Sequence, residues 1–298
     1  MLNKPIHLEK VYERFIIDLS LKLDYSSPLH IGAGSEGINK MLLEFPVNGR
    51  NVPIISAESL KGVLRSLASS LSKQMFPDNF AVKYHLKDRH IRREGLDEQQ
   101  KIMEQHLEKA KEYLKEIMPQ DVIEEMYAED KLQLLEYYLA LNCPVCKLFG
   151  AQGIAGKLTF TDGIPNIPPK FLTYVATSIN RKNRLVEGER LFSVTAVEPS
   201  DKLKYRIEII ADNVSKGSEE ARLLSSLLQW VLKFGLQIGG LKSRGYGRLT
   251  VDDESIVKIL RFKEASSDES RLNNVRALLL KDGYFQAMKI DEFMRWLG

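Results

Sequence analysis

The stretch GGLKSRGYGRL, Gly239–Leu249, holds four glycines, three cations, a serine and a tyrosine within eleven residues. Glycine permits a positive φ and a close approach of the backbone to a ligand. Lysine and arginine can neutralise phosphates, backbone N–H groups can cradle them, and Tyr246 offers a ring to a base. Taken alone, such a stretch is more often a turn with solvated charges, and it contains neither GxGxxG nor a P-loop pattern.

A second stretch of similar character, Leu29–Arg65, changes that balance. Its first part, LHIGAGSEGINK, predicts a glycine-rich loop after a strand, with glycines at positions 32, 34 and 37. Its second part predicts a helix that opens at Ser56 and carries Ser59, Lys61 and Arg65 in its first turns. The free N–H groups and the dipole of a helix start suit a phosphate. The simpler interpretation is an ordinary serine cap that needs no ligand.

The composition indicates a cytoplasmic globular protein. The chain has 298 residues, 44% of them hydrophobic, and a net charge of only +3, so any nucleic-acid binding requires local basic patches. The first ten residues, MLNKPIHLEK, lack the apolar segment of a secretory signal, and no apolar run is long enough to span a membrane. Two cysteines do not make a disulfide framework.

Apolar residues that alternate predict strands, and apolar residues at helical spacing predict helices. The clearest strand has one apolar face made of Phe15, Ile17, Leu19, Leu21, Leu23 and Tyr25. Without its insertions, the chain follows the order β-α-β-β-α-β. This is the α+β, ferredoxin-like order that the RNA-recognition module shares. The strands carry no RNP-type aromatic octapeptide.

We expect the whole chain to form one domain with three additions. Residues 76–142 are rich in Glu, Lys and Gln and predict a helical insertion, with helices near Asp97–Ile117 and Asp121–Leu141. Residues 172–197 are polar and weakly patterned, which suits a projecting hairpin. Residues 264–298 predict a helical tail at the C-terminus.

Four motifs, in sequence order, resemble the RAMP superfamily of CRISPR–Cas subunits, and above all the backbone subunit of type III effector complexes. They are HIGAG, PIISAESLKGVLR, CKLFG with GKLTFTD, and GGLKSRGYGRL. The likeness extends over about residues 15–251, and the basic segment around Ser178–Phe192 resembles the family's thumb hairpin. In that family several copies stack along a CRISPR RNA, and their thumbs interrupt the guide–target duplex at regular intervals.

The resemblance implies that the matching residues bind RNA. The helix start would grip the guide backbone, the two glycine-rich loops would lie beside the RNA, and the thumb would add a cation. The residues concerned are His30, Gly32, Gly34, Ser59, Lys61, Arg65, Arg181, Lys242, Ser243, Arg244 and Tyr246. Where the family has Pro-Gly-Ser-Ser, this chain has Ser56-Ala57-Glu58-Ser59, which puts a negative charge near the proposed phosphate site.

Catalysis is the larger departure from the family pattern. Members that cut the target RNA use an aspartate in the loop after HIG, and the matching position here is Asn39. Asparagine can neither act as a base nor hold Mg²⁺ as a carboxylate does. Glu36 and Glu44 lie nearby in sequence, so the catalytic candidates are Asn39 and Glu36, with Mg²⁺ needed only if the chain cleaves RNA.

Two histidines and two cysteines bracket the predicted insertion, as His85-x4-His90 and Cys143-Pro-Val-Cys146. Together they could form a tetrahedral structural zinc site, and the resemblance supports this because related subunits carry zinc in this region. The alternative is two thiols in a loop and two surface histidines. A redox CxxC is disfavoured because we expect the pair to precede a loop and a strand, not a helix.

Three classes of function therefore compete. The first, which we favour, is a scaffold that binds CRISPR RNA and target RNA alongside other effector subunits and copies of itself, away from membranes. The second is a ribonuclease that cleaves the target, or one that processes the guide with His30, Tyr246 or Lys242. The third is a ferredoxin-like domain that binds only protein. Asn39 argues against the second class, and the paired glycine loops argue against the third.

Overall fold

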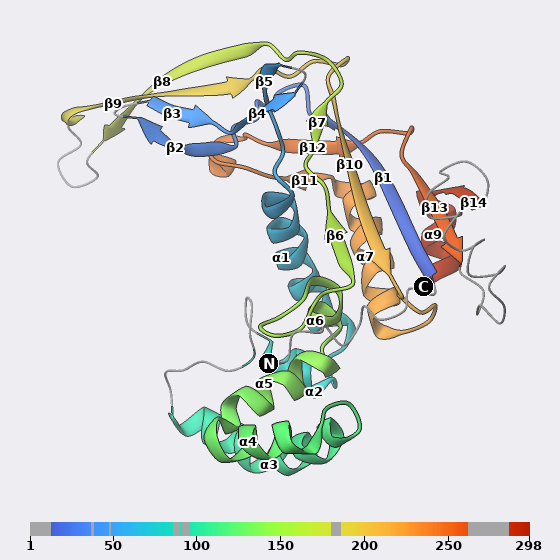
Figure 1. Ribbon diagram of the computed structural model, residues 1–298. Coiled ribbons are helices and arrows are strands. Elements are labelled where there is room, and N and C mark those ends of the chain that lie inside the picture. Colours follow the sequence, from blue (N-terminus) through green and yellow to red (C-terminus); the bar gives the residue numbers. More distant parts are fainter. Residues whose placement is uncertain are drawn as a thin grey trace.

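The computed structural model describes residues 13–36, 39–47, 49–85, 90, 96–179, 186–261 and 286–298. It shows a mixed α+β fold with one large antiparallel sheet (Figure 1). The strands of this sheet are β1 (Glu13–Leu23), β6 (Leu158–Phe160), β7 (Ile164–Pro165), β10 (Lys204–Asp212), β11 (Leu236–Gln237), β12 (Arg248–Val251), β13 (Ile256–Arg261) and β14 (Gln286–Lys289). The central order is β11-β12-β1-β10-β6, while β13 pairs with β1 and β14, and β7 pairs with β10.

Strand β1 lies at the centre of the sheet. The residues of its predicted apolar face, Phe15, Ile17, Leu19, Leu21 and Leu23, are at most 5% exposed. Its polar residues Asp18 and Ser20 are also nearly covered, at 9% and 5% exposed. They are covered because β10 flanks one side of β1 while β12 and β13 share the other. Tyr25 departs from the prediction: it lies in the turn after β1 and is 87% exposed.

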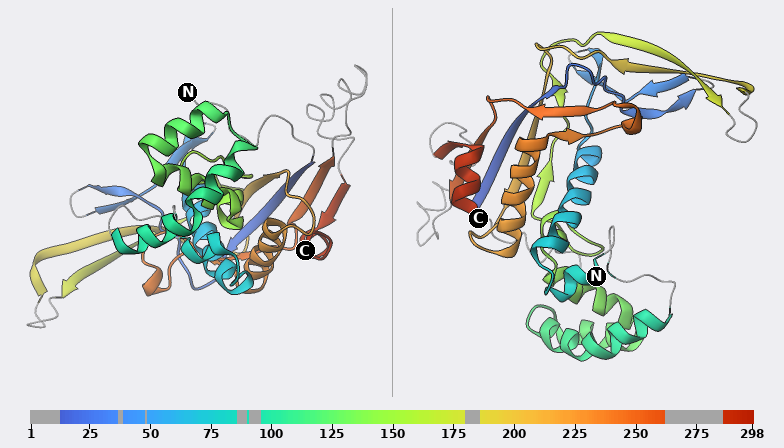
Figure 2. Two further views of the ribbon diagram at one scale, coloured as in Figure 1. Left: turned by 90° about the horizontal axis from the view of Figure 1, so that it is seen from below. Right: turned by 180° about the vertical axis from the view of Figure 1, so that it is seen from behind.

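Helices α1 (Ala57–Met75) and α7 (Glu219–Phe234) pack side by side against the main sheet (Figure 2). Serine caps both: Ser56 accepts from the backbone N–H of Ser59, and Ser218 from that of Ala221. Their apolar faces join the core of the sheet. The core residues of the two helices are Leu60, Leu64, Ala68, Ala221, Leu223, Leu224, Leu227, Leu228 and Val231.

The residues of the expected insertion form helices that project away from the sheet (Figure 1). They are α2 (Phe80–Tyr84), α3 (Leu96–Lys115), α4 (Gln120–Glu129) and α5 (Lys131–Asn142), and α6 (Pro144–Phe149) follows directly after them. The single helix predicted over Asp121–Leu141 is in fact two. The chain breaks at Asp130, whose carboxylate accepts a hydrogen bond of 3.0 Å from the backbone N–H of Gln133 and so caps α5.

A second sheet extends from the body of the molecule in the order β2-β3-β9-β8 (Figures 1 and 2). Its strands are β2 (Gly32–Glu36), β3 (Asn39–Leu42), β8 (Phe171–Ile179) and β9 (Val186–Val197). A short hairpin of β4 (Glu44–Val47) and β5 (Arg50–Pro53) follows β3. The glycine-rich stretch predicted to be a loop is therefore largely the strand β2, with an irregular register between Gly32 and Ser35.

The C-terminal segment is not wholly helical, as we expected it to be. Its described part begins with β14, which pairs with β13 and widens the main sheet. Helix α9 (Ile290–Leu297) follows and packs on α7. Phe293 anchors it, with its ring centroid 5.0 Å from that of Phe15 in an edge-to-face contact. None of the helices in the described part of the chain is both long and apolar enough to cross a membrane.

Candidate functional site

The two glycine-rich stretches meet around His30. This side chain is 4% exposed, and its Nδ1 lies 2.7 Å from the carbonyl oxygen of Thr195 on β9. A Cβ at Gly240 would lie 3.2 Å from the His30 ring, and one at Gly239 would collide with the His30 carbonyl oxygen. Gly32 is equally close, because its Cβ would lie 3.3 Å from His30 Nε2. His30 therefore packs between the two stretches, and glycine is required for them to approach.

The second glycine stretch forms a short 3₁₀ turn, η1 (Lys242–Arg244), between two left-handed residues, Leu241 and Gly245. Two side chains hold this turn, the exposed Gln237 and the buried Ser27. Gln237 Nε2 donates to the carbonyl oxygens of Lys242 at 2.9 Å and Tyr246 at 3.1 Å. Ser27, which is 2% exposed, donates to the carbonyl oxygen of Gly245 at 2.6 Å. All three residues of the turn are exposed, so a firmly held backbone presents two cations and a hydroxyl to solvent.

The start of α1 differs from the phosphate site that the sequence suggests. The backbone N–H of Ala57 donates to the Asp162 carboxylate at 2.7 Å, and that of Ser59 to Ser56 Oγ at 3.3 Å. The Ser59 hydroxyl itself accepts from Ser56 Oγ at 2.7 Å. A protein carboxylate thus occupies the position that a phosphate would need, and Glu58 adds a second negative charge in the same turn.

Further along α1, Lys61 and Arg65 lie beside the same cleft. Both line a cleft between α1 and the loop of residues 150–156 that follows α6. The thumb cation Arg181 lies outside the described residues. The RNA-binding candidates therefore fall into two described groups, one on η1 and one on the second and third turns of α1.

The catalytic candidates lie on two paired strands and not in an open loop. The register of the β2–β3 hairpin places Glu36 opposite Asn39. On its other side β3 runs parallel to β9, where Asn39 is level with Ser193. Asn39 thus stands at the turn end of the β2–β3 hairpin, beside β9.

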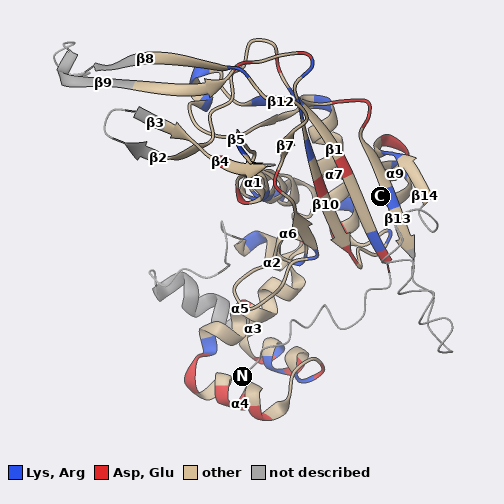
Figure 3. Ribbon diagram, turned by 45° about the horizontal axis from the view of Figure 1, so that its top comes forward, with Lys and Arg blue, Asp and Glu red and all other residues tan. Residues whose placement is uncertain are grey.

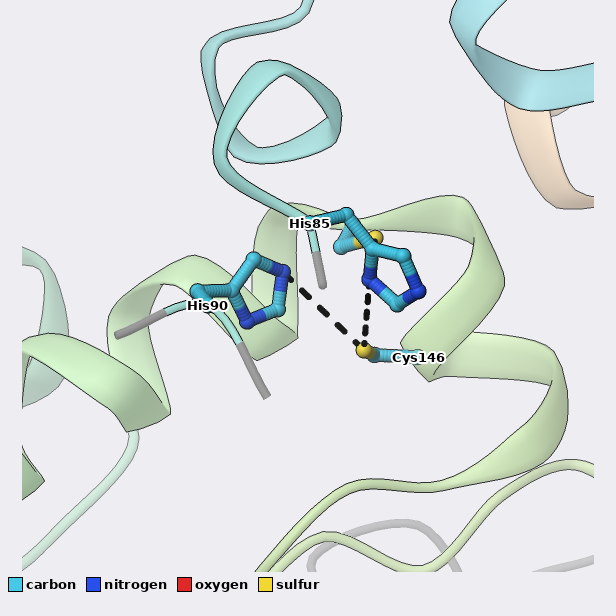
Figure 4. Close-up of side chains that lie close together, drawn as sticks. His85, His90 and Cys146 are labelled. Atoms are coloured by element: carbon cyan, nitrogen blue, oxygen red, sulfur yellow. Dashed lines mark hydrogen bonds between the residues drawn. The ribbon is translucent and has the colours of Figure 1, made fainter. Parts of the chain in front are cut away.

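The four expected metal ligands come together in one buried cluster (Figure 4). All of their ligand atoms lie within 4.8 Å of one another, and none of the residues is more than 3% exposed. His85 Nδ1 is 3.4 Å from Cys143 Sγ and 3.6 Å from Cys146 Sγ, and Cys146 Sγ is 4.0 Å from His90 Nε2. These atoms come from His85, which follows α2, from His90, between α2 and α3, and from the two cysteines at the ends of the CxxC turn.

Glu136 on α5 orients one of the ligands. Its carboxylate accepts from His90 Nδ1 at 2.9 Å and from the His90 backbone N–H at 2.9 and 3.0 Å. With Nδ1 donating to Glu136, Nε2 faces the sulfurs, and it can bind a metal once it has lost its proton. A carboxylate behind a ligating histidine is the usual arrangement around a protein-bound metal.

The electrostatics of the cluster favour an anionic sulfur. Burial raises the pKa of the Cys143 thiol, but hydrogen bonds from Cys146 and from both histidines outweigh it and bring the pKa to about 2. The Cys143 thiolate and burial together raise the pKa of Cys146. Burial lowers the pKa of His90, but Cys143 and Glu136 outweigh it and raise the pKa to about 9. The thiolate is the form of cysteine that binds a metal.

The donor set fits a tetrahedral ion. Metal–nitrogen bonds of about 2.0 Å and metal–sulfur bonds of about 2.3 Å imply ligand–ligand distances of roughly 3.3–3.8 Å in a regular tetrahedron. The observed separations of 3.4, 3.6 and 4.0 Å are close to this. The insertion contains one more histidine, His106, which does not join the cluster: its ring stacks on that of Phe80, with the centroids 5.1 Å apart. The described residues therefore hold a buried His₂Cys₂ cluster that can bind a metal such as zinc.

One expectation about the cysteines was wrong. The CxxC pair does open a helix, since Cys143 precedes α6 and Pro144 is its first residue. The helix was missed because it has only six residues and ends before Gly150, where the chain takes a positive φ. A redox role is still disfavoured, because both thiols are 0% exposed and cannot meet the thiol of another protein.

The family can now be assigned. The sequence model of the RAMP superfamily matches residues 22–250, which is most of the chain. The chain belongs to the RAMP superfamily. The match starts within β1 and ends within β12, so it takes in the projecting sheet, the insertion and η1. No curated protein matches the chain.

Among solved structures, this RAMP-superfamily chain is similar to a chain from the cryo-EM structure of the type III-B Cmr-beta bound to cognate target RNA. The two are 14% identical, with a TM-score of 0.45. The similarity covers 84% of this chain but spans only 61% of the length of the other.

Three features of the site were not predicted from the sequence. Glu136 is one glutamate among many in the insertion, and only folding brings it to His90. Asp162 ends the motif GKLTFTD, but nothing local indicates that it reaches the start of α1. The loop of residues 150–156, which lines a cleft with α1, is the third feature. Its glycines at positions 150, 153 and 156, within the CKLFG…GKLTFTD motif, were the sequence pattern that could have indicated it.

Proposed function

We propose that this chain is an RNA-binding backbone subunit of a type III CRISPR–Cas effector complex. It would hold a CRISPR RNA and its target RNA beside other effector subunits and further copies of itself. Membership of the RAMP superfamily supports this role. We also propose that the fold is one ferredoxin-like domain, similar to the RNA-recognition module, with the helical insertion and the thumb-like hairpin as additions.

The strand order supports the ferredoxin-like core. Strands β12, β1, β10 and β6 are neighbours in that order and all antiparallel. Helix α1 lies in sequence between β1 and β6, and α7 lies between β10 and β12. This is the β-α-β-β-α-β arrangement once the additions are set aside.

The observation that carries the RNA-binding proposal is the η1 turn. Three exposed residues, Lys242, Ser243 and Arg244, stand on a backbone that Gln237 and Ser27 hold fixed. The turn packs against the His30 segment, which reaches the projecting sheet through Thr195. Cations and a hydroxyl on a rigid loop beside an extended hairpin suit a phosphate backbone without base selection.

The distribution of charge supports a path for RNA near the sheet and not at the far end of the insertion. Figure 3 shows acidic residues along α4, at the outer end of the insertion. Asp121, Glu124, Glu125 and Glu129 are all exposed there. This surface would repel a nucleic acid and suits contact with protein.

We propose zinc as the ion of the His₂Cys₂ cluster, in a structural role. Two thiolates and two imidazoles in a tetrahedral arrangement are a common donor set for structural zinc. The cluster would tie the segment around His85 and His90 to the CxxC turn of α6. Purified protein never exposed to chelator should contain about one zinc per chain. A sample without zinc by elemental analysis, although folded, would contradict this assignment.

We propose that the chain does not cleave its target at the β2–β3 hairpin. Asn39 has the size of an aspartate but lacks the charge needed to position Mg²⁺ or to accept a proton from the 2′-hydroxyl. Guide binding does not depend on that charge, so it should persist.

The RNA-binding proposal is tested with single-stranded RNA of unrelated sequences, measured at several salt concentrations. We expect sequence-independent binding that weakens steeply with salt. Lys242→Ala combined with Arg244→Ala should weaken it about equally for every sequence. Lys216→Ala should not, because Lys216 precedes the start of α7 whereas η1 follows its end. Isolated chains bind fewer phosphates than a stacked assembly, so the assembled complex is measured as well. No binding in either sample would refute the proposal.

A further inference from the structure

The turn of residues 24–27, which follows β1, carries the most exposed large apolar side chain in the described part of the chain, and we call it the Tyr25 turn. Tyr25 is 87% exposed, because β1 ends at Leu23 and the chain leaves the sheet there. The alternation in the sequence placed this ring on the apolar face of the strand, so the structure moves it from the core into solvent. A single exposed ring is common on protein surfaces, so its surroundings decide whether it has a use.

The Tyr25 turn has a fixed backbone. The N–H of Ser27 donates to the carbonyl oxygen of Asp24 at 2.9 Å and closes the turn. The carboxylate of Asp24 accepts from the backbone N–H and from the hydroxyl of Ser26, both at 3.3 Å. Hydrogen bonds from an aspartate to the residues that follow it are typical of tight turns. The backbone on both sides of Tyr25 is therefore ordered before any ligand binds, which lowers the entropic cost of binding.

Hydrogen bonds also tie the Tyr25 turn to the residues that follow η1. The hydroxyl of Ser27 donates to the carbonyl oxygen of Gly245 at 2.6 Å and accepts from the backbone N–H of Arg248 at 2.7 Å. The N–H of Asp24 donates to the carbonyl oxygen of Arg248 at 3.0 Å. The side chain of Arg248 is 61% exposed, and its Nε lies 3.6 Å from the Asp24 carboxylate. Tyr25 thus projects from a segment that is bonded to the η1 loop, close to Arg248 and to the two exposed cations of η1.

The ring of Tyr25 is more accessible than the one that the sequence suggested for a base. Tyr246 is half-buried, and its N–H lies 3.4 Å from the carbonyl oxygen of Leu241 within the η1 loop. The chain neighbours of Tyr25, Asp24 and Ser26, are polar, so the ring is not part of an apolar run such as the core of a protein interface needs. An accessible ring among cations and polar groups suits single-stranded nucleic acid, whose phosphates bind to cations and whose bases stack on aromatic rings.

We propose that Tyr25 is a stacking platform for one base of the RNA, which rests on the proposed RNA-binding function. The cations of η1 hold the phosphate backbone, and the Tyr25 ring covers the face of a base beside it. Every base has a face that can stack on an aromatic ring, so this contact favours unpaired nucleotides of any sequence. It differs from the contacts of η1 because it needs the base, whereas those need only the phosphates.

The test separates a base contact from a phosphate contact. The full chain is titrated, with fluorescence anisotropy as the readout, into two RNA oligomers of equal length: one unpaired and of mixed sequence, the other with abasic ribose in place of every nucleoside. Tyr25→Ala should weaken binding of the mixed-sequence oligomer about tenfold, as expected for one lost base stack, and should leave binding of the abasic oligomer unchanged. The slope of log affinity against log salt should match that of wild type, because no phosphate contact is lost. Tyr25→Phe should bind like wild type, because the ring remains.

Two further variants serve as controls. Lys242→Ala should weaken binding of both oligomers and reduce the salt slope by about 0.7, as expected for one lost phosphate contact. Tyr113→Ala removes an exposed ring from α3, in the insertion, and should change neither affinity. Thermal unfolding of each variant checks the fold, and we expect Tyr25→Ala to unfold like wild type because this side chain lies outside the core.

The outcomes that would overturn the stacking role are distinct from a failure of the proposed function. If wild type binds the mixed-sequence RNA and Tyr25→Ala binds it equally well, Tyr25 is not a stacking platform, although the proposed function stands. An equal loss with the abasic oligomer would mean that the variant disturbs η1, and it would also overturn the stacking role. Unchanged RNA affinity with lost assembly into the complex would make the ring a protein contact. If wild type binds no RNA, alone or assembled, the proposed function fails and the stacking role fails with it.

Discussion

Replacing Glu136 by glutamine tests whether the His₂Cys₂ cluster is a metal site. The carboxylate accepts three hydrogen bonds, from the ring Nδ1 of His90 and twice from its backbone N–H, at 2.9 to 3.0 Å. Glutamine has nearly the same shape but only one accepting oxygen and no charge. The Glu136→Gln variant should therefore keep the fold, since one acceptor remains for the backbone N–H, but lose the carboxylate behind the ring.

The size of the effect follows from the role of that carboxylate. It fixes the ring so that Nε2 points to the sulfurs, and its charge makes the imidazole a better donor to a cation. Losing such a partner costs about 10- to 100-fold in metal affinity. This corresponds to roughly 1.4–2.7 kcal/mol of binding free energy at 25 °C. An effect of this size is far smaller than the loss of a ligand, so the variant remains able to bind.

The measurement is competition for Zn²⁺ between the reduced protein and a chromogenic chelator at neutral pH. Glu124→Gln is the control, because it removes the same charge from an exposed position on α4 whose partner is Gln120. The control should match wild type. If Glu136→Gln and the control bind zinc equally, Glu136 does not support a metal ligand. If wild type binds no zinc, the cluster is a set of buried side chains only.

Further predictions concern the helix, a buried ion pair and the catalytic position. Gly62→Ala should stabilise the chain by about 1 kcal/mol in urea unfolding, because the position is helical and exposed and an added Cβ would meet no other residue within 4 Å. If RNA passes close to α1, the added methyl group should also weaken RNA binding. Burial raises the pKa of Glu220, but Lys157 at 2.7 Å outweighs it and keeps the pKa below its ordinary 4.5. The stability that this pair contributes is therefore present above pH 4.5 and is lost as the pH falls through the lowered pKa. Glu220→Gln should lower the free energy of unfolding by about 3 kcal/mol at neutral pH. In the variant, the free energy of unfolding should also change less as the pH falls into the acid range. In the assembled complex with guide, matched target and Mg²⁺, Asn39→Asp should create a cut that wild type lacks, whereas a wild-type cut abolished by Glu36→Ala would reverse our view of this chain.

Local chemistry was enough to predict the elements of the core. The alternation in β1 and the apolar spacing of α7 specify a strand and a helix without any knowledge of their neighbours. The histidine and cysteine pairs also predicted the buried cluster, because pairs of these residue types at short spacing are typical of metal sites. In both cases the residues that decide the structure lie close together in the sequence.

The sequence could not indicate features that distant residues decide. It suggested a phosphate site at Ser56 and Ser59; Asp162 reaches that helix start from more than 100 residues away, and RNA binding there stays a prediction. The glycines after His30 suggested a loop, but pairing with a neighbouring strand makes the segment β2. Local propensity cannot reveal a strand whose stability comes from its partner.

The metal cluster and the cleft that Lys61 and Arg65 line share one short helix, α6. Cys146 belongs to the cluster, and its carbonyl oxygen accepts from the backbone N–H of Gly150, 2.8 Å away, where the cleft loop begins. The loop returns to the same helix, because the N–H of Lys157 donates to the carbonyl oxygen of Lys147 at 2.9 Å. Arg65 lines the cleft and also acts on Cys146, whose pKa it lowers against the larger opposite effects of the Cys143 thiolate and burial. A bound metal would hold α6 in place, and α6 in turn holds both ends of the loop of residues 150–156. The helical insertion is therefore more than an appendage to the sheet, because the ligands that it supplies help to set one wall of the cleft beside Lys61 and Arg65.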